Sequence, residues 1–388
     1  MATAPFNCFA IAAPGLESIV ARELSALGEQ PRIEDGGVSW DGDARSLMRA
    51  NLWLRTASRV LARVARFKTT AFYELEKRAK RIPWAQFVTA GQAVEFRVTA
   101  RKSKLYHSDA IAERLVKSVR SVVGAKHGPT ANPKPHIADR STGQQLFVVR
   151  VFHDEFTISA DTSGELLHMR GYRQAVGKAP MRETLAAALL LGADWDGSTP
   201  LLDPFCGSGT IPIEGTLIAR RIPPGLNRRF AFMDWPTFNV KSWRTLLHQA
   251  QTGARASSPV PIFGSDRDAG AIAASRANAE RAGVAADIDF QVRPISAIER
   301  SSTPGLIATN PPYGVRVSER ATLRDLYARL GQVIRDRPPG WRAVLYSSDA
   351  RLARELGMPS RELFRTTNGG IKVAALEVEV PRGDLVPA

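Results

Sequence analysis

Residues 201–210 read LLDPFCGSGT, and this sequence indicates the fold of the C-terminal half of the chain. An apolar strand ends at Asp203, a glycine-rich turn follows, and a helical pattern begins near Thr210. A helical pattern at 182–191 precedes it, and apolar strands alternate with helices after it. We expect those strands at residues 200–203, 261–265, 306–309, 342–347 and 372–380. This alternation predicts an α/β fold with a mostly parallel, doubly wound sheet.

The glycine-rich turn also indicates a cofactor, because glycines let the backbone approach a ligand closely and ligands of such sheets bind at the carboxyl ends of the strands. A P-loop for ATP would require a lysine that is absent here. A dinucleotide motif would require a third glycine at the position of Pro212. The remaining pattern, Asp-x-x-x-Gly-x-Gly-Thr, is typical of S-adenosylmethionine (SAM) methyltransferases. Its predicted cofactor-binding residues are Asp203, Pro204, Phe205, Gly207, Gly209 and Thr210.

A second motif, FGSDRD at 263–268, ends the next predicted strand. Asp266 there can accept hydrogen bonds from both hydroxyls of a ribose, and Arg267 lies beside it. The usual distance from the glycine-rich turn is about 20 residues. Because Asp203 and Asp266 are further apart, we interpret residues 220–258 as an insertion. Asp268 is expected to be the N-cap of the helix that begins near Ala269, a position that Asp prefers. This role is compatible with a ribose contact by Asp266.

The third motif, TNPPYG at 309–314, indicates the reaction. The lone pair of an exocyclic amine on a base is delocalised into the ring, so this nitrogen is a poor nucleophile. Two acceptors, the Asn310 side-chain oxygen and the Pro311 carbonyl, would draw it toward tetrahedral geometry. Pro311 and Pro312 would hold these acceptors rigidly, which is preorganisation. Tyr313 offers a ring on which a flipped base can stack. We take these four residues as the catalytic group.

Composition narrows the class of protein further. The 388 residues carry a formal net charge of +15, with 27 basic and 17 acidic residues in 1–180 and 26 and 21 in 181–388. A basic N-terminal half favours a polyanionic partner such as nucleic acid. The histidines do not have the spacing of metal ligands, and no apolar run is long enough to span a membrane. The two cysteines are far apart in the sequence, which fits a reducing compartment such as the cytoplasm. Cys206 is interpreted as a packing residue rather than a nucleophile.

The N-terminal half has the pattern of small α+β units. In residues 1–65, helical spacing runs from Pro14 to Gly28 and again over 44–53, between strand-like stretches. Residues 66–165 are expected to contain further helices, strands and one loop. These are helices at 72–81 and 108–123, strands at 93–99, 145–152 and 155–161, and a loop at 128–141. Residues 166–180 are a connector.

Taken together, the motifs resemble those of class I SAM-dependent amino-methyltransferases. LHMRGYR at 167–173 and APMRE at 179–183 are similar to the entry into the catalytic domain of THUMP-containing RNA guanine-N2 methyltransferases. That family includes the bacterial large-subunit rRNA methyltransferase L type and related tRNA enzymes. The resemblance extends over nearly the whole chain, with PGLE, GGV, PPGLN and NGG at 14–17, 36–38, 223–227 and 368–370.

The resemblance implies a fold and a cofactor pocket. It implies a ferredoxin-like domain at 1–65, a THUMP RNA-binding domain at 66–165 and a Rossmann-like class I methyltransferase domain at 181–388. Members of the family usually place an acidic residue after the third strand, against the adenine amine. Here FQVRPIS at 290–296 carries no carboxylate, so we expect the backbone or Ser296 to contact adenine.

We therefore expect an RNA methyltransferase that uses SAM to methylate the N2 amine of a guanosine, in 23S rRNA or, second, in tRNA. DNA adenine-N6 methylation and glutamine-N5 methylation of a protein share the amine chemistry, and a non-catalytic RNA-binding or assembly factor could keep the same motifs. The basic half would bind phosphates in a salt-dependent way. The residues proposed for this contact are Arg97, Arg101, Lys102, Lys104, Arg170 and Arg173.

Overall fold

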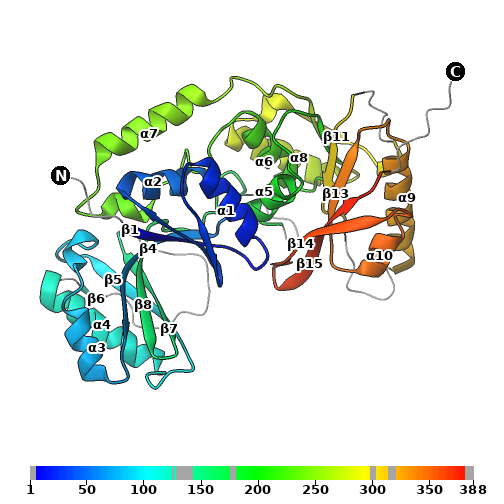
Figure 1. Ribbon diagram of the computed structural model, residues 1–388. Coiled ribbons are helices and arrows are strands. Elements are labelled where there is room, and N and C mark those ends of the chain that lie inside the picture. The colour runs from blue at the N-terminus through cyan, green and yellow to red at the C-terminus, as the bar shows by residue number, and fades with distance from the viewer. Residues whose placement is uncertain are drawn as a thin grey trace.

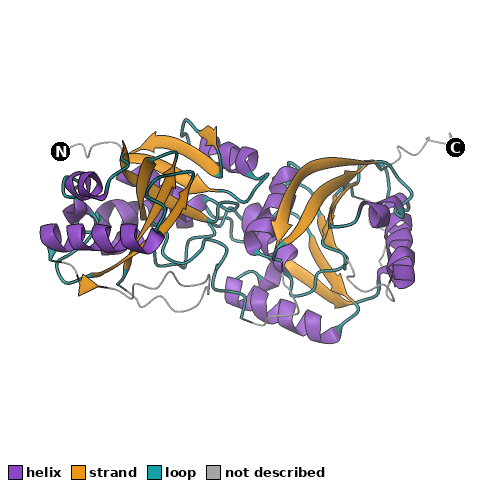
Figure 2. Ribbon diagram, turned by 90° about the horizontal axis from the view of Figure 1, so that it is seen from below, coloured by secondary structure: helices purple, strands orange, loops and turns teal. Residues whose placement is uncertain are grey.

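The computed structural model describes residues 6–124, 126–127, 143–174, 181–297, 303–312 and 320–380. Two β-sheets, one of eight strands and one of seven, occupy opposite halves of the molecule (Figures 1 and 2). The predicted loop at 128–141 and the end of the connector lie outside the described residues. Within the described part of the chain, no helix has the length and hydropathy that a membrane span requires.

The eight-stranded sheet contains all the described strands of the N-terminal half. Its strands are β1 (Phe6–Ile11), β2 (Arg32–Glu34), β3 (Gly37–Gly42), β4 (Arg59–Lys68), β5 (Ala93–Arg101), β6 (Lys126–His127), β7 (Gln145–Phe152) and β8 (Glu155–Asp161). They lie in the order β2-β3-β1-β4-β8-β7-β5-β6. Strand β4 pairs with β1 on one side and with β8 on the other. One continuous sheet therefore crosses residue 65, and the division of this half into two domains stays a prediction.

The described helices of this half pack on one face of this sheet. They are α1 (Glu17–Ala26), α2 (Ala44–Trp53), α3 (Phe72–Ala79) and α4 (Ser108–Val123), with a short 3₁₀ turn η1 (Trp84–Gln86). Side chains alternate along each strand, so Phe147, Val149 and Val151 of β7 enter the core while Val148 and Arg150 point the other way. The helices and strands predicted at 44–53, 108–123, 145–152 and 155–161 are confirmed.

The seven-stranded sheet confirms the doubly wound prediction. Its strands are β9 (Leu201–Asp203), β10 (Ile262–Asp266), β11 (Ile288–Val292), β12 (Leu306–Thr309), β13 (Arg342–Ser347), β14 (Ser360–Asn368) and β15 (Ile371–Val378). Their order is β11-β10-β9-β12-β13-β15-β14, with the first five parallel and β15 antiparallel to both neighbours. The chain leaves β9 in one direction for β10 and later returns to β12 on the other side, which makes a topological switch point.

Helices cover both faces of this second sheet. They are α5 (Glu183–Gly192), α6 (Thr210–Ala219), α8 (Ala269–Ala282), α9 (Arg320–Arg335) and α10 (Ala350–Arg354), with 3₁₀ turns η3 (Ala285–Asp287) and η4 (Ile295–Ala297). The remaining elements, η2 (Ala231–Asp234) and α7 (Val240–Gly253), belong to the insertion. Leu201 and Leu306 pack into the core with α5, α6 and α8. Leu202 and Ile307 pack into a separate core with α9 and α10, on the other side in Figure 1.

The insertion at 220–258 contains a helix that the sequence pattern did not predict. This helix, α7, lies above α2 in Figure 1 and contacts it. Its N-cap is Asn239, whose side chain accepts a hydrogen bond from the Ser242 amide at 3.0 Å. The insertion thus joins the catalytic half to the N-terminal half.

Candidate active site

The glycine-rich turn links the end of β9 to the start of α6. Gly209 has a φ of +81°, and a Cβ there would lie 3.0 Å from the Cβ of Ser275 and 3.1 Å from the Phe290 ring. Both the backbone conformation and the packing therefore require glycine at this position. Gly207 differs, because no atom lies within 4 Å of where its Cβ would be. The backbone at Gly207 is open to a ligand.

Helix α8 holds this turn through two side chains that sequence analysis missed. The Ser275 hydroxyl donates to the Gly207 carbonyl at 2.7 Å, and the Asn278 amide donates to the Ser208 carbonyl at 2.9 Å. Both side chains are buried. The available signal was their three-residue spacing in an alanine-rich helix, which places two polar groups on the face that packs against the turn.

Asp203 supports the turn from beneath. Its Oδ1 atom accepts hydrogen bonds from the Thr309 hydroxyl at 2.6 Å and from the Phe205 amide at 3.1 Å. Burial raises the pKa of the Asp203 carboxyl to about 7, against the lowering effect of those two hydrogen bonds. The carboxyl therefore connects two strand ends inside the protein and does not face the cavity described below.

Asp266 ends β10 and contacts the same turn. Its Oδ2 atom accepts from the Gly207 amide at 3.1 Å, and its Oδ1 atom accepts from the Asp268 amide at 3.0 Å. Each carboxylate oxygen keeps a further lone pair for a ligand. Asp268 caps α8 by accepting from the Gly270 amide at 2.7 Å, which confirms the predicted N-cap.

A cavity of about 710 Å³ opens beside the carboxyl ends of β9, β10 and β12. Six predicted site residues line it, and they come from all three motifs: Pro204, Phe205, Asp266, Arg267, Asn310 and Pro312. Six further lining residues were not predicted: Arg293, Pro294, Ile295, Thr322, Leu323 and Leu326. The cavity lies at the switch point of the sheet, where doubly wound proteins bind their ligands.

The remaining predicted site residues do not line this cavity. Within the glycine-rich motif these are Asp203, Gly207, Gly209 and Thr210, which form or support the turn. Pro311 is buried beside the cavity-lining Asn310 and Pro312. Ser296 lies in η4, one residue beyond the lining Ile295, and its carbonyl accepts from Arg329 at 3.3 Å. Tyr313 lies outside the described residues.

Asn310 presents an unsatisfied acceptor at the cavity. Its Oδ1 atom is buried and has no hydrogen-bond partner among the described residues. An unmade hydrogen bond at a buried polar atom costs about 1–3 kcal/mol, and at the edge of a cavity such an atom is available to a hydrogen-bond donor of a ligand. The sequence analysis predicted that this oxygen accepts a hydrogen bond from the reacting amine.

Cys206 is buried at the base of the turn. Burial, with Asp203 and Asp266 nearby, raises the pKa of its thiol well above the usual value. A thiol in this state is not the thiolate that nucleophilic catalysis needs. The packing interpretation therefore fits the structure. Among the described residues, no group of three or more His, Cys, Asp or Glu side chains could hold a metal ion.

The basic residues predicted to contact RNA separate into two groups. Arg97 and Arg101 lie on β5, and Lys102 and Lys104 are exposed just after it. Arg170 is instead 2% exposed, in an ion pair with Glu214 and a hydrogen bond to the carbonyl of Arg55. Its side chain joins the two halves of the molecule and is not accessible to a phosphate, which corrects that prediction.

Arg173 is also largely enclosed. Its guanidinium lies 3.2 Å from the Glu183 carboxylate and donates to the Met181 carbonyl at 2.6 Å. Burial raises the pKa of Glu183 to about 7, although Arg173 acts in the opposite direction. Arg173 thus fixes the connector to the start of α5.

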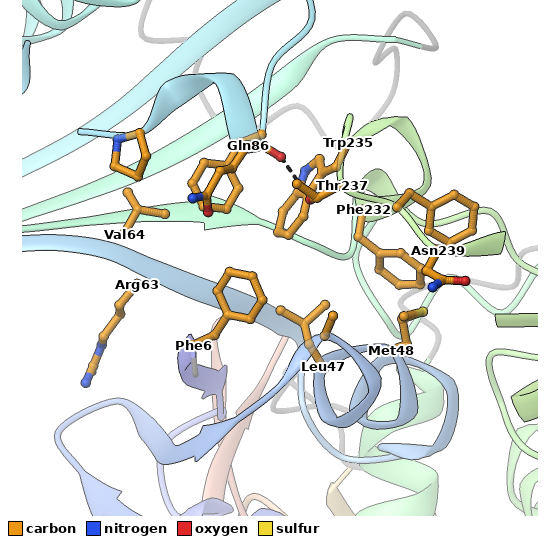
Figure 3. A pocket seen from close by; sticks show the side chains of 14 residues that line it. Phe6, Leu47, Met48, Arg63, Val64, Gln86, Phe232, Trp235, Thr237 and Asn239 are labelled. Atoms are coloured by element: carbon orange, nitrogen blue, oxygen red, sulfur yellow. Dashed lines mark hydrogen bonds between the residues drawn. The ribbon is translucent and has the colours of Figure 1, made fainter. Parts of the chain in front are cut away.

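A second cavity, of about 410 Å³, lies between the eight-stranded sheet and the insertion (Figure 3). Its walls are mainly apolar and include Phe6, Met48, Phe232 and Trp235. None of the predicted catalytic or cofactor-binding residues lines it. We therefore assign the chemistry to the cavity that contains Asn310.

Family models and known relatives agree with this geometry. The model of the RMKL-like methyltransferase domain matches residues 170–376, and that of the RlmL ferredoxin-like domain matches 7–61. "Putative RNA methyltransferase slr0064" of Synechocystis sp. is 34% identical over 96% of each chain. "Ribosomal RNA large subunit methyltransferase K/L" of Syntrophotalea carbinolica is 35% identical over 97% of this chain, which spans 54% of that relative.

Solved structures share the complete fold. A "predicted N6-adenine-specific DNA methylase" from Listeria monocytogenes superposes with a TM-score of 0.86 at 33% identity, covering 97% of each chain. SMU.472, described as "a putative methyltransferase complexed with SAH", superposes with a TM-score of 0.84 at 27% identity, over 98% of this chain and 100% of that one. The methyltransferase-domain model matches residues 170–376 of this chain, and the Synechocystis relative matches it over nearly the full length of both proteins. This chain is therefore a methyltransferase and belongs to the RMKL-like methyltransferase family.

Proposed function

We propose that this protein transfers a methyl group from SAM to the exocyclic N2 amine of a guanosine in RNA, with 23S rRNA as the first candidate substrate and tRNA as the second. The buried Oδ1 atom of Asn310, which lies at the cavity and has no hydrogen-bond partner among the described residues, carries this proposal. It is a rigidly held acceptor that fits the N–H group of an amine.

The residues of the glycine-rich turn and of the cavity suit the cofactor. Gly207 has open space on its Cβ side, and Asp266 has carboxylate lone pairs for a ribose. Pro294 and Ile295 line the cavity after β11, where the usual carboxylate is absent, and offer apolar contact to an adenine. The relative SMU.472 is described as complexed with SAH, which supports the same cofactor class here. When bound, SAM would supply a methyl group on a sulfonium sulfur, whose bond to the methyl carbon breaks on transfer and leaves a neutral thioether.

The protein's own contribution would be preorganisation. Asn310 Oδ1 and the Pro311 carbonyl would accept hydrogen bonds from the amine and localise its lone pair, so that the nitrogen can form the new N–C bond. The nitrogen then releases one proton to water. Because the newly methylated nitrogen is positively charged and loses its proton readily, the site needs no strong base. The target base must leave its stack to reach this oxygen.

The choice of RNA rests on charge and on relatives. Residues 1–180 hold ten more basic than acidic side chains. One relative is named an rRNA large subunit methyltransferase and another a putative RNA methyltransferase. We assign residues 66–165 to a THUMP domain that orients the RNA. Both cysteines are free thiols, consistent with the reducing cytoplasm. DNA adenine-N6 methylation is the alternative outside RNA, because the Listeria structure is described as a predicted N6-adenine-specific DNA methylase.

The test uses purified protein, methyl-labelled SAM and separate pools of unmodified 23S rRNA, unmodified tRNA and double-stranded DNA. Each pool is digested to nucleosides and the labelled nucleoside is identified. We expect label in N2-methylguanosine from RNA, absent with Asn310→Ala. Label in N6-methyladenine from DNA, or no label in any pool while SAM binds, would overturn the proposal.

A further inference from the structure

The face of the eight-stranded sheet opposite its helices, here called the open face, carries aromatic rings and arginines around a hollow. A hollow of about 360 Å³ lies on this face across β1, β4, β8 and β7. Two aromatic rings and three arginines line it: Phe9, Phe152, Arg63, Arg66 and Arg150. The described helices pack on the opposite face. Phe152, Arg66 and Arg150 are exposed to solvent here, whereas Phe9 is buried beneath Arg63, which is ion-paired with Glu34.

Strand register extends this row of cations. Arg97 and Arg101 of β5 pair with Val148 and Phe152 of β7, so their side chains lie on the same face. Lys68 pairs with Glu155 in the same way. The β4 register shifts between Arg63 and Ala65, and this bulge lets both Arg63 and Arg66 point to the open face.

Basic groups on this face outnumber acidic ones. Among the described side chains that line or directly flank the hollow, seven are basic (Arg63, Arg66, Lys68, Arg97, Arg101, Lys102 and Arg150) and four are acidic (Glu34, Asp35, Glu95 and Glu155). Arg66 pairs with Glu155 and Arg150 with Asp35, but these arginine side chains are 71% and 51% exposed. Exposed pairs contribute about 0–1 kcal/mol, so a phosphate can replace the carboxylate.

Cations lie over both rings. The Arg63 guanidinium carbon is 4.3 Å from the centre of the Phe9 ring. Arg150 and Lys102 lie 5.8 and 5.9 Å from the centre of the Phe152 ring, which is 40% exposed. Aromatic rings and guanidinium planes on a sheet are platforms on which unstacked bases lie, while nearby cations hold the phosphates.

We propose that this open sheet face, defined by Phe9, Arg63, Arg66, Arg97, Arg101, Arg150 and Phe152, binds an unpaired segment of the substrate RNA. This inference rests on the proposed function and adds where and in what form the RNA is held. A base-paired segment would not fit as well, because its bases are stacked on one another and cannot stack on Phe152.

The test compares a triple variant, Arg66→Ala, Arg150→Ala and Phe152→Ala, with a matched control. The control, Arg229→Ala, Arg361→Ala and Tyr73→Ala, also removes two exposed, ion-paired arginines and one exposed ring. Fluorescence anisotropy measures binding of an unstructured 20-nucleotide RNA and of a hairpin over a range of KCl concentrations. Methylation of 23S rRNA gives kcat and KM, and thermal unfolding with SAM affinity verifies the fold.

We expect the triple variant to bind unstructured RNA at least 10-fold more weakly, with a shallower salt dependence. Its KM for rRNA should rise while kcat at saturating RNA stays within twofold, and the control should match wild type. The proposal would be overturned if the triple variant kept the wild-type RNA affinity and KM, or if the control variant lost as much RNA affinity. It would also be overturned if the triple variant lost as much affinity for the hairpin as for the unstructured RNA. If wild type binds RNA through this face but methylates none, the surface stands and the proposed function fails.

Discussion

The Thr309 hydroxyl donates a 2.6 Å hydrogen bond to Oδ1 of Asp203 inside the protein. Asp203 ends the strand before the glycine-rich turn, and Thr309 ends the strand before Asn310. A single buried contact therefore fixes the spacing between the cofactor turn and the catalytic motif, which lie more than 100 residues apart in the chain.

Thr309→Val should destabilise the protein. Valine keeps the shape of threonine but leaves the buried Asp203 carboxyl without this donor, which costs about 1–3 kcal/mol of the free energy of unfolding. Thr309→Ser keeps the hydroxyl and is the control. Urea unfolding followed by tryptophan fluorescence measures both, and equal midpoints for the two variants would contradict the assignment.

Asp203 should also give stability a specific pH dependence. Its folded pKa of about 7 exceeds the ordinary value of 3.8, so the folded state holds the proton more tightly than the unfolded state. This contribution is fully present below about pH 4 and is lost as pH rises toward 7. Relative to Asp203→Asn, wild type should lose up to about 1.4 kcal/mol per pH unit across that interval. Parallel stability curves for the two proteins would contradict the raised pKa.

Local sequence patterns predicted the catalytic sheet well but not the complete topology. Buried parallel strands such as β12 are short apolar runs, and their carboxyl ends carried the motifs. Strand β14 was not predicted, because it lies at the edge of the sheet and many of its residues are polar. Helix α7 was not predicted, because it lies in an insertion rich in arginine and tryptophan. The pairing of β4 with β8 joins residues far apart, which no local pattern encodes.

The candidate site shows the same limit. Asp266 and Asn310 were found because each follows a strand directly in the sequence. Ile295 and Leu323 were missed, since they reach the cavity from segments without a motif. Arg170 was placed with the RNA-binding residues on its charge alone, and only the fold reveals its burial against Glu214.

Asp266→Ala should weaken SAM binding by about 1–3 kcal/mol, the range for hydrogen bonds to a charged group. Asp268→Ala is the control, because it removes the cap of α8 and leaves the Asp266 carboxylate in place. Isothermal titration calorimetry measures both affinities. If the two variants lose the same affinity, the effect comes from the helix and not from a ribose contact.

Asn278→Ala should weaken SAM binding about 10-fold, because the Ser208 carbonyl loses its donor and the turn is free to move. The exposed Glu280 lies on the same helix, so Glu280→Ala controls for changes in α8 itself. At saturating SAM, the kcat of Asn278→Ala should approach that of wild type. A lowered kcat with unchanged SAM affinity would show that Asn278 does not act through the turn.

Asn310→Ala should reduce kcat by at least 100-fold, since one removed transition-state hydrogen bond costs about 10²–10³ in rate. SAM affinity should stay within a few-fold, because the assigned role of Oδ1 is toward the amine. Asn310→Asp keeps an oxygen acceptor at the same place, so it should retain more activity than the alanine variant. Single-turnover transfer of labelled methyl to rRNA, together with calorimetry, separates the two effects. A 100-fold loss of SAM affinity in Asn310→Ala would instead assign this residue to cofactor binding.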